Sequence, residues 1–233
     1  MTHSWEFDED LEGFSGLVPL FPLPNVVLFP HALMPLHIFE PRYRRMVTDA
    51  LDGERMIAMA LTRPGWQKSA SSTANLPLHQ IMGLGKIIAH EKLEDGRYYL
   101  VLRGLARVKL AFEQPADLPY RLGHVDICQE HLEPTPTYDR QERAAELVSL
   151  FSQLFPEIPL KKLFLSASSD LPLQTLCDII LGAVPLPPEH SQQFMDDLDV
   201  DSRSLKLLGV LQGEARDAVQ PKSRKFPPDF SAN

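Results

Sequence analysis

The sequence predicts an α+β protein in which a small, twisted β domain is followed by an α-helical bundle. Two patterns support this fold class. Across residues 18–131 the apolar residues recur mostly at the two-residue period of half-buried strands, and about six strands and one helix are expected there. Across residues 139–218 they recur at the longer period of amphipathic helices. The segment EPTPT, residues 133–137, separates the two patterns and is the predicted domain boundary.

The first strands are expected in a proline-rich stretch. Residues 25–29 (NVVLF) and 34–39 (MPLHIF) are predicted as two short strands separated by a bend at Pro30. Proline cannot donate to a strand ladder, so we expect the prolines to set the strand boundaries. Pro41 then begins a helix whose apolar residues share one face, and Gly53 is expected to end it.

The clearest hairpin of the chain follows. Residues 55–61 have the length and pattern of a strand, and residues 86–112 predict two long arms joined by a turn at Gly96. Gly104, inside the second arm, predicts a bulge or bend that curls the sheet toward closure. Residues 120–130 supply one more strand.

The second half of the sequence predicts helices joined by short turns that begin with Pro or Asp, which is typical of a small bundle. Their apolar stripes lie within residues 147–154, 160–166, 173–184 and 205–211. Residues 1–17 are interpreted as an acidic leader, and residues 219–233, which show no period, as a disordered tail.

Composition disfavours several classes of function. The formal net charge of -8 disfavours binding to nucleic-acid phosphates, which depends on Lys and Arg. The acidic start lacks the features of a signal peptide, and no apolar run reaches the roughly 18 residues of a membrane span. Cys128 and Cys177 form no CxxC pair, and the eight histidines show no metal-ligand spacing. We therefore expect a cytoplasmic protein without cofactor, metal or membrane partner.

No motif for catalysis is present in the sequence. GFSG, residues 13–16, does not have the spacing of a nucleophile elbow. GLGK, residues 83–86, differs from a phosphate-binding loop, because Gln80 occupies the position of the first glycine and Ile87 follows the lysine. Cys177 lies in the middle of an apolar helix stripe, which indicates a core residue and not a nucleophile. We expect neither ATP hydrolysis nor proteolysis by this chain.

A small basic cluster, Arg42, Arg44 and Arg45, lies on the helix that begins at Pro41. Two interpretations are open. The cluster can be a solvated helix face with one arginine paired to Glu40 or Asp49, or it can bind an anion; the solvated face is favoured.

Four segments together resemble the amino-terminal domain of the Lon ATP-dependent protease family: LFPLPNVVLFP, PLHIFEPRYRRMV, EDGRYYLVLRG and VPLPPEHSQQFMDDLDV. The similarity runs from about Val18 to Gln212. It implies a twisted β domain of the type likened to the pseudouridine-synthase-associated (PUA-like) pseudo-barrel, followed by a helical bundle. His31, where a glycine is common in the family, and a long loop from Pro64 to Leu76 depart from the family pattern.

The resemblance also implies a function. Proteases of this family continue into an ATPase module and a Ser-Lys peptidase module, and neither is expected in a chain that ends at Asn233. A stand-alone, non-catalytic interaction module is therefore expected. Its partners would be unfolded or damaged proteins with exposed apolar segments, together with a protease or chaperone that acts in trans. Two alternatives are an RNA-binding PUA-like module, by fold analogy only, and a small-molecule binder that uses the cavity of the β domain.

Four residues are predicted to bind protein. Phe29, His31 and Met34 flank the bend at Pro30, and Trp66 lies in the unpatterned segment 62–77, which is expected to be a mobile surface loop. The alternative is that Met34 and Trp66 only cap the β core.

Overall fold

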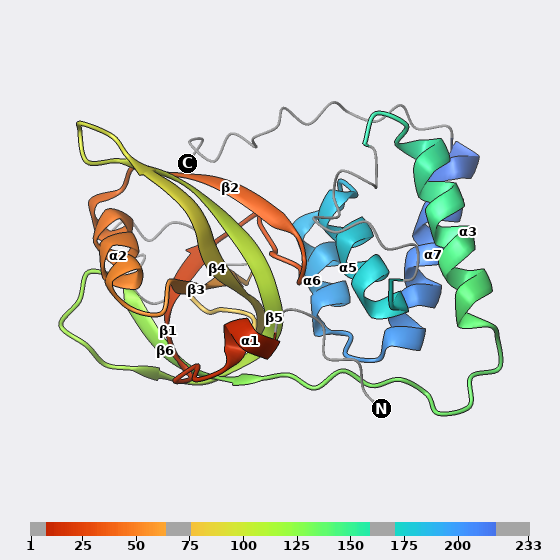
Figure 1. Cartoon of the computed structure of the whole chain (residues 1–233), viewed down its shortest axis with the longest axis horizontal. Coiled ribbons are helices and arrows are strands. Elements are labelled where there is room, and N and C mark those ends of the chain that lie inside the picture. Colours follow the sequence, from red (N-terminus) through yellow and green to blue (C-terminus); the bar gives the residue numbers. More distant parts are fainter. Residues whose placement is uncertain (1–7, 64–75, 159–170, 218–233) are drawn as a thin grey trace.

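A computed structural model describes residues 8–63, 76–158 and 171–217 of the chain. Its strands form one sheet, and a layer of helices lies beside that sheet (Figure 1). The strands are β1 (Leu17–Leu23), β2 (Leu33–Ile38), β3 (Met56–Leu61), β4 (Ile81–Lys92), β5 (Tyr98–Gln114) and β6 (Arg121–Ile127). The predicted α+β class is confirmed, and the number of strands agrees with the expected six.

Five of the strands close into a barrel. The order is β2-β5-β4-β3-β1-β6, and β5 also pairs with β6, so β5, β4, β3, β1 and β6 form a ring. β5 is 17 residues long, and it pairs with β2 over its first part and with β6 from Val108 onward. Leu105 has no partner on β4, because Leu84 pairs with Ala106 and Gly85 pairs with Gly104. This bulge bends β5, as predicted for Gly104.

The predicted strand at residues 25–29 is wrong. These residues form no strand, and the strand lies earlier, in β1, which contains Pro19 and Pro22. Both prolines are tolerated because the neighbours of β1 overlap only at Leu20: β6 pairs with residues 17–20 and β3 with residues 20–23. Each proline therefore needs a ladder partner on one side only.

The segment after β1 instead links the barrel to the helices. Leu28 is buried in a cluster with barrel residues, whereas Phe29 is buried among helical residues. The main chain passes so close to the sheet that a Cβ on Gly83 would lie 1.9 Å from the Leu28 carbonyl oxygen, and one on Gly104 would lie 2.0 Å from that of Phe29. Glycine is required at both places.

The predicted helix at Pro41 is α2 (Pro41–Asp52), and it covers one end of the barrel. Its buried residues are Tyr43, Met46, Val47 and Ala50. The helix ends before Gly53, whose φ is −112°, so the left-handed conformation falls on Arg55 instead, with φ of 62°.

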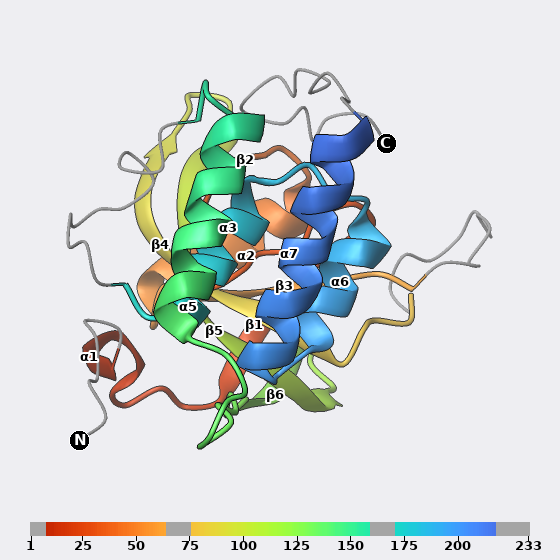
Figure 2. The same ribbon diagram turned by 90° about the vertical axis from the view of Figure 1, so that its right-hand side faces the viewer.

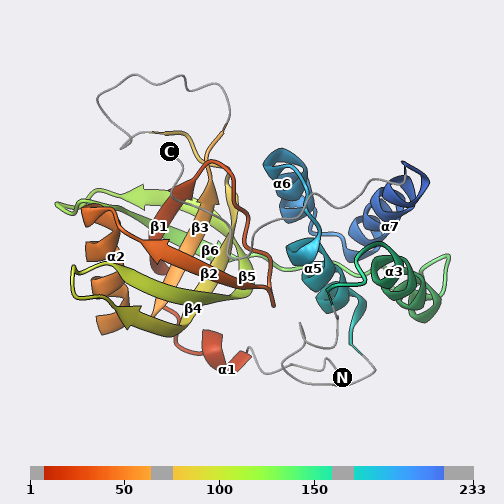
Figure 3. The same ribbon diagram turned by 90° about the horizontal axis from the view of Figure 1, so that it is seen from above.

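The helical layer contains α3 (Arg140–Leu154), α5 (Leu173–Ala183), α6 (Pro188–Asp196) and α7 (Val200–Asp217). Figure 2 shows α3 and α7 on the face turned away from the barrel, and Figure 3 shows α5 and α6 between them and the barrel. Helix α6 was not predicted; it begins at Pro188, and proline suits the first helical position. The predicted helix within residues 160–166 lies outside the described residues.

A short helix, α1 (Asp8–Leu11), lies within the segment interpreted as an acidic leader. Its Asp10 carboxylate accepts hydrogen bonds from Lys86, at 2.6 Å, and from Arg103. Asp10 therefore ties α1 to two basic side chains of the barrel, one on β4 and one on β5.

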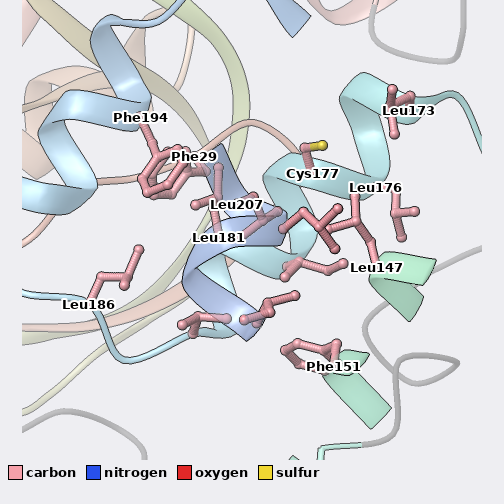
Figure 4. Close-up of a cluster of buried hydrophobic side chains, with 14 of the residues drawn as sticks. Phe29, Leu147, Phe151, Leu173, Leu176, Cys177, Leu181, Leu186, Phe194 and Leu207 are labelled. Carbon is pink, nitrogen blue, oxygen red and sulfur yellow. The ribbon is translucent and has the colours of Figure 1, made fainter. Parts of the chain in front are cut away.

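The helices enclose their own core, which also takes in Phe29 from the barrel half (Figure 4). The Phe29 ring lies beside Phe194 of α6, and Cys177 of α5 is fully buried in the same core. Burial raises the pKa of the Cys177 thiol to about 12, which makes it inert at neutral pH. The prediction that Cys177 is a core residue is confirmed.

A buried ion cluster joins the two halves. Arg107 of β5 donates two hydrogen bonds to the Asp178 carboxylate of α5, at 2.6 and 2.7 Å. Glu130 accepts from Arg107 at 2.9 Å and from Arg203 of α7 at 2.6 Å. Burial is the largest single effect and would lower the pKa of Arg107, but the charge and hydrogen bonds of Asp178 and the charge of Glu130 together outweigh it, and the pKa is raised. Two guanidinium groups thus face two carboxylates.

No helix in the described part of the chain is long and apolar enough to cross a lipid bilayer.

Candidate protein-binding surface

One edge of the sheet is formed by β2. Within the described residues β2 pairs only with β5. The Gly104 N–H donates to the Ala32 carbonyl oxygen at 2.9 Å, and main-chain groups alternate along an antiparallel strand. The main-chain groups of Leu33, Pro35 and His37 therefore point away from β5, toward the unpaired edge.

Pro35 fits this edge because it has no N–H to lose. It leaves the edge with two N–H donors, on Leu33 and His37, and with three carbonyl acceptors. An extended peptide could pair with these groups as an added strand.

The side chains of the same residues project from the outside of the sheet, next to exposed side chains of β5 and β4. His37 is opposite Tyr99, and Pro35 is opposite Val101, which is in turn opposite Ala89. We call this surface the outer face; it consists of Leu33, Pro35, His37, Phe39, Ile88, Ala89, Tyr99 and Val101. The alternate residues Leu36, Ile38, Leu100 and Leu102 are buried in the barrel core.

Aromatic side chains gather at one end of the outer face. Tyr99 is 50% exposed, and its ring stacks on the His37 ring with centroids 4.7 Å apart. Phe39 is 37% exposed, with its ring centroid 6.0 Å from that of His37. Exposed aromatic rings close to a free strand edge are typical of protein-binding surfaces.

Ile88 is added to this surface by a bulge. Ile87 pairs with Leu102 and Ala89 with Val101, so Ile88 has no partner on β5. Its side chain is 42% exposed although its neighbour Ile87 is buried.

A second exposed aromatic pair lies elsewhere. Phe112 of β5 is 58% exposed, and its ring stacks on His124 of β6 with centroids 4.5 Å apart. The strand beside this ring is β6, which is paired with both β5 and β1, so the ring lies away from the edge of β2. Phe112 is therefore a natural control for Tyr99.

The three predicted protein-binding residues that the structure describes do not share one exposed surface. Phe29 is 1% exposed and lies in the helical core, and Met34 is partly buried against the barrel core. His31 has a positive φ of 65°, its N–H donates to the Gly104 carbonyl, and burial lowers the pKa of its imidazole. Trp66 and most of its segment lie outside the described residues. The binding role of these four residues stays a prediction.

Sequence reasoning did not select Tyr99, Phe39, Ile88 or Leu33. The period-two pattern of the arm YYLVL places Tyr99 and Val101 on one side, and the same pattern in LMPLHIF groups Leu33, His37 and Phe39. That signal was available. It could not reveal which side faces solvent or which strand edge stays unpaired, because both depend on the order of strands in the sheet.

No group of His, Cys, Asp and Glu suited to hold a metal ion occurs among the described residues. Of the two thiols, Cys128 is partly buried, and burial raises its pKa. Neither thiol is therefore activated as a nucleophile.

Comparison with known proteins agrees with this fold. A family model described as the ATP-dependent protease La (LON) substrate-binding domain matches residues 17–213. The chain belongs to this family. The resemblance to the Lon amino-terminal domain is thus confirmed.

The curated relatives of this LON substrate-binding domain are distant in sequence. The Lon protease of Desulfosudis oleivorans is 23% identical over 190 residues, which cover 82% of this chain and 23% of the relative. The Lon protease of Escherichia coli K12 is 26% identical over 213 residues, which cover 89% of this chain and 26% of the relative. The chain spans about a quarter of the length of these relatives.

Two solved structures share the fold of this LON substrate-binding domain. The N-terminal domain of the Mycobacterium avium complex Lon protease superposes with a TM-score of 0.62 at 16% identity, covering 84% of this chain and 98% of that chain. A Lon N-terminal domain protein from Xanthomonas campestris gives a TM-score of 0.58 at 21% identity, covering 83% and 97%.

Proposed function

We propose that this LON substrate-binding domain binds extended, apolar segments of unfolded or damaged proteins along the edge of β2 and the outer face. It acts without catalysis, in the cytoplasm, and can pass its ligand to a protease or chaperone in trans. The single observation that carries this proposal is the edge of β2, which has no strand partner among the described residues, beside the exposed rings of Tyr99 and Phe39 and the half-buried ring of His37.

Main-chain pairing alone would be too weak to hold such a ligand. Five hydrogen bonds to the β2 edge, at about 0.5–1.5 kcal/mol each, give roughly 2.5–7.5 kcal/mol in total. The loss of translational and rotational freedom on association costs at least about 4 kcal/mol. Burial of apolar side chains on the outer face must therefore supply much of the affinity, so the ligand is expected to be apolar and extended.

The test is a binding titration with a labelled polypeptide that is permanently unfolded by reduction and carboxymethylation. Fluorescence anisotropy should rise with this ligand and not with the same polypeptide in its native fold. Tyr99→Ser should weaken binding by roughly 10-fold or more, because burying a large apolar side chain is worth about 1.5–3 kcal/mol. Phe112→Ser removes a similarly exposed and stacked ring from the control patch and should change the affinity less than twofold.

The role of the strand edge has its own variant pair. His37→Ala and His37→Pro both remove the imidazole, but only the proline removes the outward N–H. Binding should be weaker for His37→Pro than for His37→Ala, while the thermal midpoints of the two variants stay close. Equal affinity of wild type, Tyr99→Ser and His37→Pro for the unfolded ligand would refute the proposed surface.

A further inference from the structure

A small basic pocket is lined by residues of α2 and of the tip of the β4–β5 hairpin. These two elements lie at the same end of the barrel (Figure 1). Its volume is about 270 Å³, and Arg44, Thr48, Lys92, Gly96 and Tyr98 contribute to its walls. Pockets for drug-sized ligands have volumes of about 300–1,000 Å³, so this one suits a small group.

The three arginines of the basic cluster differ in their partners, and the two interpretations of the cluster apply to different members. Arg42 is paired with Glu40 at 2.8 Å and Arg45 with Asp49 at 2.8 Å, as expected for a solvated helix face. Arg44 is different. Within the described part of the chain no carboxylate lies at ion-pair distance from its guanidinium.

The hairpin turn holds the Arg44 guanidinium in place. A Cβ built on Gly96 would lie 2.1 Å from the Arg44 Nη2 atom, so the guanidinium rests against the bare Cα of the turn. Gly96 also has a φ of 82°, which favours glycine independently. The nearby Asp95 carboxylate is occupied, since it accepts from the Arg97 main-chain N–H at 3.0 Å and from the Arg97 guanidinium at 2.6 Å.

A second cation faces the same pocket from β4. The Lys92 Nζ atom lies 5.7 Å from the centroid of the Tyr98 ring, within the range of a cation–π contact, and it has no carboxylate at ion-pair distance among residues that the structure describes. The Thr48 hydroxyl donates to the Arg44 carbonyl at 3.0 Å and lies 3.0 Å from the Tyr98 hydroxyl. The two hydroxyl groups are satisfied by these contacts. Arg45 also lines the pocket but is paired with Asp49, so Arg44 and Lys92 are the pocket cations that, among the described residues, have no carboxylate partner.

We propose that this pocket binds a phosphate monoester, either as a small molecule or as a phosphorylated side chain. A phosphoryl group carries a charge of about −1.5 to −2 near pH 7, which matches the two cations, and its oxygens accept charge-assisted hydrogen bonds from arginine and lysine. A carboxylate or a phosphodiester carries a single negative charge and leaves one of the cations uncompensated. The pocket shares no residue with the outer face, and its test uses a different ligand, so it is independent of the proposed function.

The test is a titration of the full chain followed by ¹H–¹⁵N NMR spectra, with methyl phosphate as the probe and sodium chloride adjusted to constant ionic strength. The amide signals of Gly96 and Tyr98 should shift and reach saturation. Arg44→Gln and Lys92→Gln should each weaken binding by roughly 10-fold, the loss expected for one charge-assisted hydrogen bond. Lys109→Gln removes an equal charge from an exposed position on β5 and should change affinity less than twofold.

Two further ligand arms sharpen the result. Acetate and dimethyl phosphate should bind at least several-fold more weakly than methyl phosphate. A phosphoserine peptide that binds more tightly than methyl phosphate would identify a modified side chain as the ligand, and equal affinity would identify a small phosphate; both support the pocket. Shifts that grow linearly without saturation, equal binding of acetate, or unchanged affinity in both pocket variants would overturn the proposal.

Discussion

The buried ion cluster gives the most quantitative prediction for stability. Asp178→Asn keeps the size of the side chain but leaves the Arg107 and Arg203 guanidinium groups facing only one carboxylate, that of Glu130. The side chains of Asp178, Arg107 and Arg203 are 2%, 1% and 0% exposed, so water cannot compensate for the missing charge. Removing one partner of a buried pair costs about 3–5 kcal/mol.

The assay is urea unfolding monitored by circular dichroism. The free energies of unfolding of wild type and Asp178→Asn are compared with the same slope of free energy against urea concentration. For a domain of this size each kcal/mol lowers the melting temperature by about 2–4 °C, so a loss of about 10 °C is also expected. Lys206→Gln is the control, because the lysine of its pair with Asp197 is 61% exposed to solvent. It should cost less than about 1 kcal/mol. A loss below about 1 kcal/mol for Asp178→Asn would refute the inference that the cluster is dry and joins the two halves.

Two further predictions concern stability. The Arg140 hydrogen bond holds the pKa of the Asp201 carboxyl well below its usual range. This pair therefore stabilises the folded state fully above the unfolded pKa of about 3.9, and the stabilisation is lost as pH falls further. Arg140→Gln should have a lower free energy of unfolding than wild type at pH 7, and the two free energies should converge in acid. Gly104→Ala should destabilise the fold by about 1–3 kcal/mol or more, because the new Cβ would collide with the Phe29 carbonyl. Gly209→Ala should stabilise it by about 0.5–1 kcal/mol, because Gly209 lies in α7 with open space around it. Equal urea midpoints for the two variants would contradict the packing around Gly104.

Local patterns in the sequence were sufficient for elements that carry their own boundaries. Helix α2 has Pro41 at its start and a single apolar face, and the β4–β5 hairpin has an Asp-Gly turn whose Gly96 takes the positive φ that such a turn needs. The bulge beside Gly104 followed from the same local reasoning. In each case proline or glycine determines the local main-chain conformation: proline fixes φ and has no N–H to donate, and glycine permits a positive φ or a close approach of another segment.

Features set by tertiary pairing could not be predicted in this way. Pro19 and Pro22 lie inside β1 because two neighbouring strands overlap at only one residue, which no local pattern reveals. The apolar segment around Leu28 and Phe29 has the composition of a strand, but its residues fill two different cores. The candidate surface was missed for the same reason, because an unpaired edge is a property of the sheet order and not of the strand.

Amide hydrogen exchange at the β2 edge tests the central claim most directly. In the free protein the outward amides of Leu33 and His37 should exchange fast, while those of Met34 and Leu36, which point toward β5, should already be protected. A saturating concentration of the unfolded polypeptide should slow exchange at Leu33 and His37 by at least 10-fold, since an added strand would accept their hydrogen bonds. Binding that leaves both amides in fast exchange and protects amides elsewhere would contradict the claim that the edge of β2 receives the ligand.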